Sequence, residues 1–265
     1  MLRSALINVM VQAARKAARS LKRDFGEVER LQVSLKGPGN FVSAADRRAE
    51  EILHEELTRS RPGYGFVGEE GGSRPGSDTT HSWIVDPLDG TTNFLHGIPQ
   101  FAISIALERQ KTIVAGVIYN PATDELFTAE RGQGAFLNDR RIRVAARTHL
   151  GQAVVACGLP HLGRGDLAAF GREFAIVQQH VAGLRRFGAA SLDLAWTAAG
   201  RFDGYWERNL SAWDMAAGLL MVREAGGFVT DLHGGDLMLE TGDIVAGNET
   251  LHRTLLKLLQ QAEED

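Results

Sequence analysis

Hydrophobic residues recur at helical spacing at the start of the chain and predict a helix over residues 2–22. Its apolar stripe consists of Leu2, Ala5, Leu6, Val9, Met10, Ala13 and Ala17. Two glycines and a proline then predict a loop over residues 36–40, because they break either regular structure. Ser43 suits the N-cap of a second helix, which ends at Arg61-Pro-Gly63. This helix is expected to bury Ala45, Ala49, Ile52, Leu53 and Leu57.

From Phe66 onward the apolar runs are short and are bounded by turn residues, which is typical of strands. A Gly/Ser-rich loop is expected over residues 71–80, and the strand at 82–85 is expected to stop at Asp86-Pro87. The predicted strands are 66–70, 82–85, 101–108, 112–119, 125–130, 136–137 and 141–144. The first half therefore reads as helices with a mostly antiparallel sheet.

In the second half, strands and helices alternate, which favours an α/β layer. The strands are predicted at 154–157, 184–187, 204–207, 228–231 and 244–246. The helices are predicted at 167–181, 191–199, 213–224 and 251–261. The region 145–150 contains no flexible linker. We therefore expect two subdomains that share an interface, residues 1–147 of α+β type and residues 148–265 of α/β type.

Composition narrows the function classes. The 265 residues include 29 Lys+Arg and 33 Asp+Glu, and this mildly acidic balance does not favour nucleic acid. The single cysteine, Cys157, excludes an internal disulfide and a Cys-based zinc site, and it fits a cytoplasmic, reducing compartment. No apolar run approaches the ~18 residues of a membrane span. The Arg-rich first helix resembles a transit peptide, but a structural helix is the preferred interpretation.

The histidines also constrain any metal site. No two of the eight are spaced i,i+4, so an H-E-x-x-H helix is absent. A metal would therefore have to be held mainly by carboxylates, which favours Mg²⁺ over Zn²⁺.

The segment from Trp83 to Asn93 carries the strongest chemical signal. A buried strand delivers Asp86 at its end, and Asp89 follows three residues later, so the two carboxylates can converge. Gly90 permits close approach of the backbone to a ligand. Thr91 and Thr92 suit the N-cap of a helix whose free N–H groups could receive a phosphate ester. The alternative is an Asp-rich turn that only caps a helix.

Further acids lie near other predicted element ends. Glu69 and Glu70 end a strand after a glycine, and Asp46 and Asp214 lie in the first turns of helices. Each of these acids alone would more often be structural, since acids favour helix N-termini.

Taken together, these motifs resemble the inositol monophosphatase family. The resemblance runs from the first helix to Gly247-Asn248, and the segments that carry it are Gly68-Glu-Glu70, Trp83-x-x-Asp-Pro-Leu-Asp-Gly-Thr-Thr-Asn-Phe94, Trp213-Asp214 and Glu224-Ala-Gly-Gly227. The resemblance implies a Mg²⁺-dependent, Li⁺-inhibited phosphomonoesterase that acts as a homodimer on a small phosphorylated polyol. It also implies the layered αβαβα sandwich shared with fructose-1,6-bisphosphatase.

The resemblance further implies a role for each matching residue. Glu69 would bind the activating metal, Asp86 would bridge two metals, and the Leu88 carbonyl would complete the first site. Asp89 and Asp214 would hold the second metal together with Asp86.

Water and substrate positions follow from the same resemblance. The Thr91 hydroxyl and Asp46 would orient the attacking water, and the Gly90 and Thr91 N–H groups would contact phosphate. The family's contacts to the substrate hydroxyls match Gly188, Ala189, Ala190 and Glu207, and Lys36 falls in its mobile loop. Asn40 replaces the family's usual aspartate, which affects a loosely held third Mg²⁺, so two or three ions per site are expected.

The residues support the same chemistry physically. Uncatalysed hydrolysis of phosphate monoesters is so slow that enzymes accelerate it by up to ~10²¹-fold. Two cations roughly 3.5–4 Å apart would screen the dianion and activate water. The four acids Glu69, Asp86, Asp89 and Asp214 would balance two Mg²⁺. Neither a C-x₅-R loop after Cys157 nor a G-x-S-x-G motif occurs, so direct attack by water is preferred.

Three readings remain open. The first is hydrolysis of inositol 1-phosphate. The second keeps the metal core but takes fructose 1,6-bisphosphate, histidinol phosphate or 3′-phosphoadenosine nucleotides. The third is a regulatory protein that binds RNA or the transcription machinery, which is not favoured, and no membrane partner is expected. Glu207 is interpreted as accepting hydrogen bonds from vicinal hydroxyls, with a surface glutamate paired with Arg208 or another base as the alternative.

Overall fold

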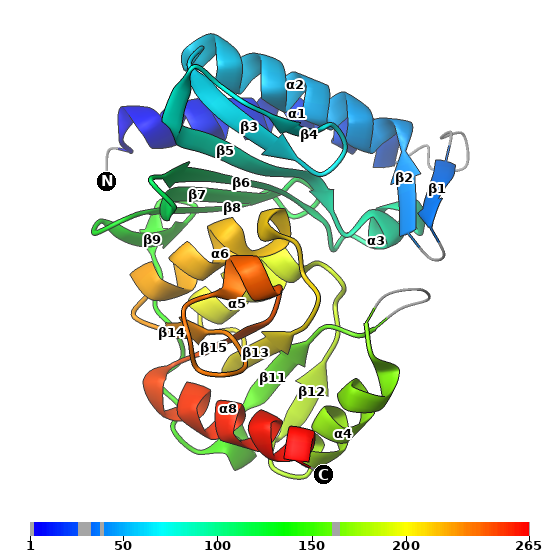
Figure 1. The fold of residues 1–265 in the computed structure, drawn as a ribbon, viewed down its shortest axis with the longest axis vertical. Coiled ribbons are helices and arrows are strands. Elements are labelled where there is room, and N and C mark those ends of the chain that lie inside the picture. Colours follow the sequence, from blue (N-terminus) through cyan, green and yellow to red (C-terminus); the bar gives the residue numbers. More distant parts are fainter. Residues whose placement is uncertain (1–2, 26–32, 38–39, 161–164, 265) are drawn as a thin grey trace.

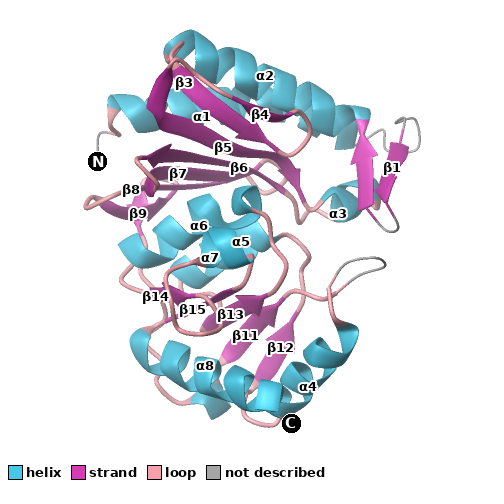
Figure 2. Ribbon diagram, viewed as in Figure 1, coloured by secondary structure: helices cyan, strands magenta, loops and turns pink. Residues whose placement is uncertain are grey.

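Helices and sheets alternate in five layers (Figures 1 and 2). The structure is a computed structural model that describes residues 3–25, 33–37, 40–160 and 165–264, with only the backbone of residues 33–37, 40–43 and 264. Helices α1 (Ala5–Phe25) and α2 (Ala44–Ser60) cover one sheet, α5 (Ala190–Ala198) and α6 (Ala212–Glu224) fill the middle, and α4 (Leu167–Gln178) and α8 (Glu249–Glu264) cover the other sheet. The predicted αβαβα sandwich is confirmed.

The first layer is the helix pair α1 and α2, which pack side by side. The predicted stripe of α1 is wrong in part. Ala5 is exposed, whereas Ile7, Val11, Ala14 and Ala18 join the buried face. The buried sector is wider than predicted because α1 contacts both α2 and the sheet. In α2 the predicted core residues are buried except for the half-buried Ile52.

The loop predicted over residues 36–40 is wrong in part. Strands β1 (Val33–Gly37) and β2 (Asn40–Ser43) pair antiparallel, with Gly37 opposite Asn40. Residues 38 and 39 lie outside the described residues. Hairpin pairing of the flanking residues therefore extends into a stretch that composition alone assigned to loop. The side chains of Lys36 and Asn40 also lie outside the described part of the chain.

The upper sheet has eight strands in the described residues, in the order β10-β9-β8-β7-β6-β5-β3-β4. Its strands are β3 (Tyr64–Gly68), β4 (Gly72–Arg74), β5 (Asp78–Asp89), β6 (Ala102–Arg109), β7 (Thr112–Asn120), β8 (Glu125–Glu130), β9 (Gly134–Leu137) and β10 (Arg140–Arg141). All neighbours are antiparallel except β3 and β5. The loop predicted over residues 71–80 instead contains β4 and the start of β5, because Gly68 and Gly72 close a hairpin. The strand predicted at 141–144 is also wrong beyond Arg141.

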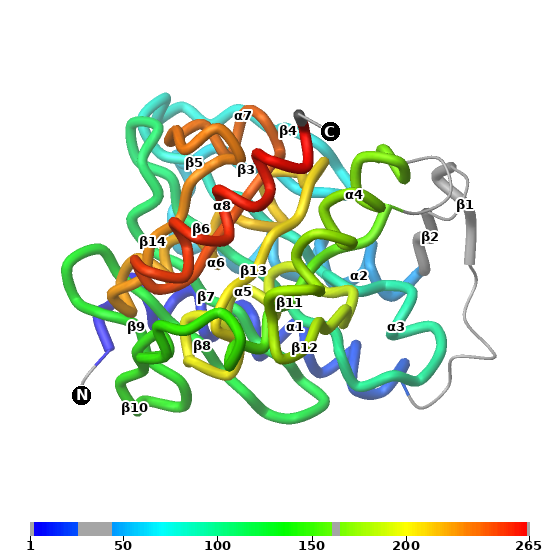
Figure 3. The backbone as a smooth tube through the Cα atoms, turned by 90° about the horizontal axis from the view of Figure 1, so that it is seen from below, coloured from blue at the N-terminus to red at the C-terminus, as the bar shows by residue number. Residues whose placement is uncertain are grey.

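The lower sheet has five described strands in the order β12-β11-β13-β15-β14. They are β11 (Val154–Cys157), β12 (Gly183–Arg185), β13 (Gly204–Glu207), β14 (Phe228–Thr230) and β15 (Ile244–Gly247). Strand β13 pairs parallel with β11 and antiparallel with β15, which makes this a mixed sheet. Two short helices, η2 (Leu150–Gln152) and α7 (Met238–Thr241), were not predicted. Seen from below, α4 and α8 lie side by side across the outer face (Figure 3).

The middle layer joins both sheets. Small residues let α6 approach closely: a Cβ on Gly116 of β7 would lie 3.1 Å from the Cα of Ala217 in α6. Residues Met215 to Val222 of α6 are all buried, as expected for a helix packed on all sides. This packing fixes the start of α6, where Asp214 lies. Among the described residues, none of the helices combines the length and the apolar character needed to cross a membrane.

Candidate active site

A bulge at the end of β5 presents the two central carboxylates. Asp86 pairs with Ser104 of β6 and Asp89 with Ala102, so β5 contains one extra residue between them. The prediction that the strand stops at Asp86-Pro87 is therefore wrong. Pro87 is accommodated inside the strand, as prolines are at bulges. The bulge also folds the chain back locally, and the Leu88 N–H donates to Asp86 Oδ1 at 2.9 Å.

Gly90 turns the chain from β5 into the short helix α3 (Thr91–Leu95). Its φ of +89° lies in the left-handed region, and a Cβ there would lie 2.8 Å from the Gln100 carbonyl oxygen. Gly90 is the N-cap and no side chain caps the helix, so the prediction of Thr91 and Thr92 as caps is wrong. Thr91 Oγ1 instead lies 2.9 Å from Asp46 Oδ1 and 3.1 Å from the Leu88 carbonyl oxygen. A hydroxyl with a single hydrogen donates to one of them at a time.

Helices α5 and α6 of the middle layer hold two of the carboxylates, those of Asp89 and Asp214, in position. Asp89 Oδ2 accepts hydrogen bonds from the N–H and the hydroxyl of Ser191, near the start of α5. Asp214 forms a capping box at the start of α6, where its Oδ2 accepts from the Ser211 N–H at 2.7 Å. Both carboxylates are therefore held by backbone that the packed helices fix.

Glu69 lies in the turn after β3, and its N–H donates to the Val85 carbonyl of β5 at 3.3 Å. The next two N–H groups, of Glu70 and Gly71, donate to the two carboxylate oxygens of Glu50 at 2.7 and 2.6 Å. Glu50 is 3% exposed and was not predicted as a site residue. The available signal was its i,i+4 spacing from Asp46, which places both acids on one face of α2.

The four acids Glu69, Asp86, Asp89 and Asp214, which we call the four-acid cluster, repel one another. Burial and the charges of Glu69, Asp89 and Asp214 raise the pKa of Asp86 well above its usual range. Burial also raises the pKa of Asp89 to about 6, although hydrogen bonds from Ser191 oppose the shift. Burial and the Asp89 charge raise the pKa of Asp214. The cluster thus disfavours its own charged state.

A cation would relieve this repulsion. In the described parts of the chain, Asp86, Asp89 and Asp214 form no ion pair with Lys, Arg or His. Nor do three His, Cys, Asp or Glu side chains there already converge as a ready set of metal ligands. Buried oxygen ligands without an internal cation fit a hard divalent ion.

The predicted phosphate and substrate positions lie beside one another. A Cβ on Gly90 would lie 3.2 Å from the Ala189 Cβ, and Asn93 Nδ2 donates to the Phe187 carbonyl at 2.7 Å. Gly188 has a φ of +76°, and α5 begins at Ala190. The structure therefore brings the 90–93 turn against the 187–190 turn, although the two are about a hundred residues apart in sequence.

Glu207 ends β13 and accepts a hydrogen bond from the buried Tyr205 hydroxyl. A Cβ on Gly158 would lie 1.8 Å from the Glu207 carboxyl carbon, so any larger residue there would force this carboxylate to move. Glu207 and Asp214 line one cavity of about 60 Å³. A predicted substrate contact and a predicted metal ligand therefore face the same space.

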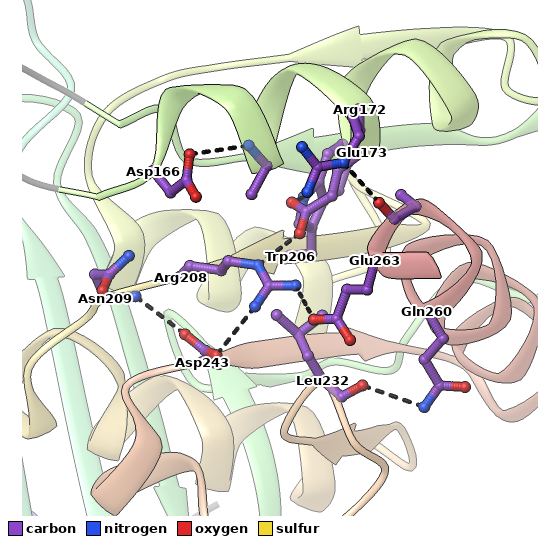
Figure 4. A network of polar contacts seen from close by, with 12 residues as sticks. Asp166, Arg172, Glu173, Trp206, Arg208, Asn209, Leu232, Asp243, Gln260 and Glu263 are labelled. Carbon is purple, nitrogen blue, oxygen red and sulfur yellow. Dashed lines mark hydrogen bonds and ion pairs between the residues drawn. The ribbon is translucent and has the colours of Figure 1, made fainter. Parts of the chain in front are cut away.

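Arg208 contacts acids other than Glu207. Its guanidinium binds Glu173 of α4 at 2.5 Å, Asp243 at 3.4 Å and Glu263 of α8 at 2.6 Å (Figure 4). We call these four residues the Arg208 cluster. Three carboxylates therefore engage the guanidinium of Arg208, which is one of the bases that the alternative interpretation offers to Glu207. The cluster ties β13 to the outer helices directly behind Glu207.

The chain is similar to known proteins in both sequence and fold. A profile of the inositol monophosphatase family matches residues 2–264. The chain is 66% identical to an inositol-1-monophosphatase of Mesorhizobium japonicum, covering 98% of both chains. It is 42% identical to the Nus factor SuhB of Pseudomonas aeruginosa, covering 96% of both. The crystal structure of extragenic suppressor protein suhB from Bartonella henselae superposes with a TM-score of 0.95 at 61% identity, covering 97% of this chain and 99% of that one.

Proposed function

Because the chain belongs to the inositol monophosphatase family and is a phosphatase, we propose that it hydrolyses inositol 1-phosphate and similar small polyol phosphates. The observation that carries this proposal is the four-acid cluster near the Thr91–Asp46 hydrogen bond, of which Asp214 lines the same cavity as Glu207. The name of the relative from Mesorhizobium japonicum supports the choice of substrate.

The proposed cofactor is Mg²⁺, with two or three ions per site. Glu69, Asp86 and the Leu88 carbonyl would hold the first ion, and Asp86, Asp89 and Asp214 the second. Bound there, Mg²⁺ would screen the phosphate charge, lower the pKa of water and stabilise the leaving oxygen. Inhibition by Li⁺ follows from occupation of the second position and is proposed on the family resemblance.

The chain's own residues would position and deprotonate the attacking water. Thr91 Oγ1 would accept a hydrogen bond from this water while its own hydrogen points to Asp46 Oδ1, 2.9 Å away. As the water oxygen bonds to phosphorus, its proton would pass to Thr91 Oγ1 and the threonine proton to Asp46. Asp46 is 1% exposed, so bulk water would not compete for this hydrogen bond. The ester P–O bond would break, and the leaving oxygen would take a proton from a solvent water molecule. Asp46 would then return its proton to solvent, which balances the step.

Substrate would be held from two sides. The backbone N–H groups of Gly90 and Thr91 would donate to phosphate oxygens, since they stand at the turn where α3 begins. Glu207 would accept hydrogen bonds from two vicinal hydroxyls of the polyol, while Gly188, Ala189 and Ala190 would contact the ring from the opposite turn. Lys36 would belong to a loop that closes near the metals.

A phosphate-release panel tests the proposal. Inositol 1-phosphate, fructose 1,6-bisphosphate, histidinol phosphate and 3′-phosphoadenosine 5′-phosphate are compared under Mg²⁺ titration, with Li⁺ as inhibitor. We expect the highest kcat/KM for inositol 1-phosphate and no turnover after chelation of the metal. A tenfold preference for any other substrate would contradict the proposed specificity.

A second candidate function is regulatory binding to the transcription machinery, which the SuhB-named relative favours. Catalysis and binding can coexist on one chain. Binding to RNA polymerase and to RNA can be measured with the wild-type protein and with Asp86→Asn. Retained tight binding by the variant would support a separate regulatory role, and the absence of binding by the wild type would contradict it.

We also propose a cytoplasmic homodimer, as the family resemblance implies. Sedimentation velocity at micromolar concentration measures the assembly state, and a monomer at every concentration would contradict the dimer.

A further inference from the structure

Helix α2 contributes two buried acids, and only Asp46 has a role so far. Glu50 lies one helical turn later on the same face and is 3% exposed. Its two carboxylate oxygens accept from the consecutive N–H groups of Glu70 and Gly71 at 2.7 and 2.6 Å. With both oxygens engaged by short charge-assisted bonds, Glu50 is built to hold backbone rather than an ion.

The surrounding backbone leaves room for this carboxylate. A Cβ on Gly68 would lie 2.4 Å from Glu50 Oε2, and a Cβ on Gly71 would lie 2.6 Å from Glu50 Oε1. Neither glycine has a φ in the left-handed region, so the main chain itself would accept other residues there. The Glu50 carboxylate is thus one of the groups that crowd these two glycines, together with the Phe66 ring at Gly68 and the Arg74 guanidinium at Gly71.

We propose that Glu50 is a positioning residue that fixes the Glu69–Gly71 turn, and so sets the direction in which Glu69 meets the rest of the four-acid cluster. The inference rests on the proposed metal-dependent activity. Because Glu50 and Asp46 share one rigid helix, the position of Glu69 is tied to that of the Thr91 hydroxyl, which Asp46 contacts at 2.9 Å. Helix α2 thereby sets the spacing between the water-positioning pair and one metal ligand.

Glu50→Gln tests this role directly. The amide retains one acceptor oxygen but turns an NH₂ group toward the second backbone N–H, so one of the two hydrogen bonds is lost. We expect Mn²⁺ to bind about 10- to 100-fold more weakly in the absence of substrate, as when other residues that support metal ligands are removed. Free Mn²⁺ is followed by electron paramagnetic resonance. Glu51→Gln, an adjacent exposed site on the same helix, is the matched control and should bind as the wild type does.

Hydrogen exchange provides a readout that does not depend on metal. In Glu50→Gln the amides of Glu70 and Gly71 should exchange about tenfold faster, while the amides of β5 keep their wild-type protection. If Glu50→Gln fails to fold, Gly71→Ala decides, because its Cβ would lie 2.6 Å from Glu50 Oε1 and displace the carboxylate, whereas the Arg74 guanidinium, also 2.6 Å away, belongs to an exposed side chain that can move aside. Weakened Mn²⁺ binding in Gly71→Ala would support the proposal, and wild-type binding would overturn it.

Glu69→Gln separates this inference from the proposed function. If Glu69→Gln loses Mn²⁺ binding while a folded Glu50→Gln binds within twofold of wild type, the positioning role of Glu50 is wrong and the ligand assignment stands. If Glu69→Gln binds as the wild type does, the assignment of Glu69 as a ligand fails, and this inference fails with it.

Discussion

Two groups of acidic residues in this chain differ in the charges that surround their carboxylates. In the Arg208 cluster, Glu173, Asp243 and Glu263 surround a guanidinium from the chain itself (Figure 4). Burial raises the pKa of Glu173, but Arg208 and the Trp206 indole N–H oppose the shift. In the four-acid cluster the neighbouring carboxylates act in the same direction as burial. The first cluster contains its own cation, whereas Asp86, Asp89 and Asp214 of the second form no ion pair with a basic side chain in the part of the chain that the structure describes.

The comparison separates structural acids from functional ones. An acid that only stabilises the fold is placed where the chain supplies its counter-charge. The four-acid cluster instead places carboxylates that repel one another near the end of β5. Backbone hydrogen bonds and packed helices hold these carboxylates in position. Such an arrangement is expected at a functional site, where charge is reserved for a ligand.

The largest predicted effect is on turnover. Asp86→Asn removes the carboxylate that would serve both metal ions, and we expect kcat/KM to fall by roughly 10³-fold or more, since each ~1.4 kcal/mol of lost transition-state stabilisation costs tenfold. Phosphate release from inositol 1-phosphate in saturating Mg²⁺ measures the loss. Asp78→Asn, at the opposite end of β5, is the control and should stay within twofold of wild type. A tenth of wild-type activity in Asp86→Asn would refute the two-metal assignment.

The next effect is on stability and belongs to the other cluster. Arg208→Met leaves the Glu173 carboxylate buried without its cation, and we expect the free energy of unfolding to fall by about 3 kcal/mol. Urea unfolding measures it. Arg253→Met breaks the exposed Arg253–Glu249 pair and should cost at most about 0.5 kcal/mol. Equal losses in the two variants would show that burial of the Arg208 cluster has no energetic consequence.

A smaller effect is expected at Glu207, which lines the same cavity as Arg208 of the one cluster and Asp214 of the other. Glu207→Gln should raise KM for inositol 1-phosphate by about ten- to a hundredfold, because hydrogen bonds to a charged carboxylate contribute roughly 1.5–3 kcal/mol. Steady-state kinetics on inositol 1-phosphate and on an aryl phosphate compare the two substrates. Hydrolysis of the aryl phosphate should stay nearly unchanged. An equal loss on both substrates would mean that Glu207 supports the fold or the metals instead.

The spacing of apolar residues and turn residues predicted most of the helices and strands. It did not predict the contacts that hold the site residues in place. Strand β13 has the predicted bounds, Gly204 to Glu207, because its apolar run is short and flanked by turn residues. The bulge after Asp86 could not be predicted, since it depends on pairing with Ser104 of another strand. The hydrogen bonds of Ser191 to Asp89 depend likewise on tertiary packing.

The errors at the helix starts have a similar origin. Thr91 has the right chemistry for an N-cap, but its hydroxyl contacts Asp46, which lies 45 residues earlier in the chain. The sequence does not single out Glu50 as a site residue, because a glutamate inside a helix is ordinarily solvated. Its burial follows from the approach of the β3–β4 turn, which the helical pattern does not encode.

The most direct test of the central proposal, that the four-acid cluster binds a divalent cation, is the thermal stability of the protein with and without Mg²⁺ as pH changes. A raised pKa in the folded state means that the metal-free fold binds more protons than the unfolded chain. For Asp89, stability is therefore fully present below its usual pKa near 4 and is lost as pH rises through about 6. Mg²⁺ needs the deprotonated acids, so its stabilising effect should grow over the same range.

At a concentration 100 times its Kd, Mg²⁺ should contribute about 2.7 kcal/mol at pH 7.5, raising Tm by about 5–10 °C, and far less at pH 5. NaCl at matched ionic strength is the control, and Asp86→Asn should lose the increase. An unchanged Tm at pH 7.5, or an equal rise in Asp86→Asn, would contradict the account.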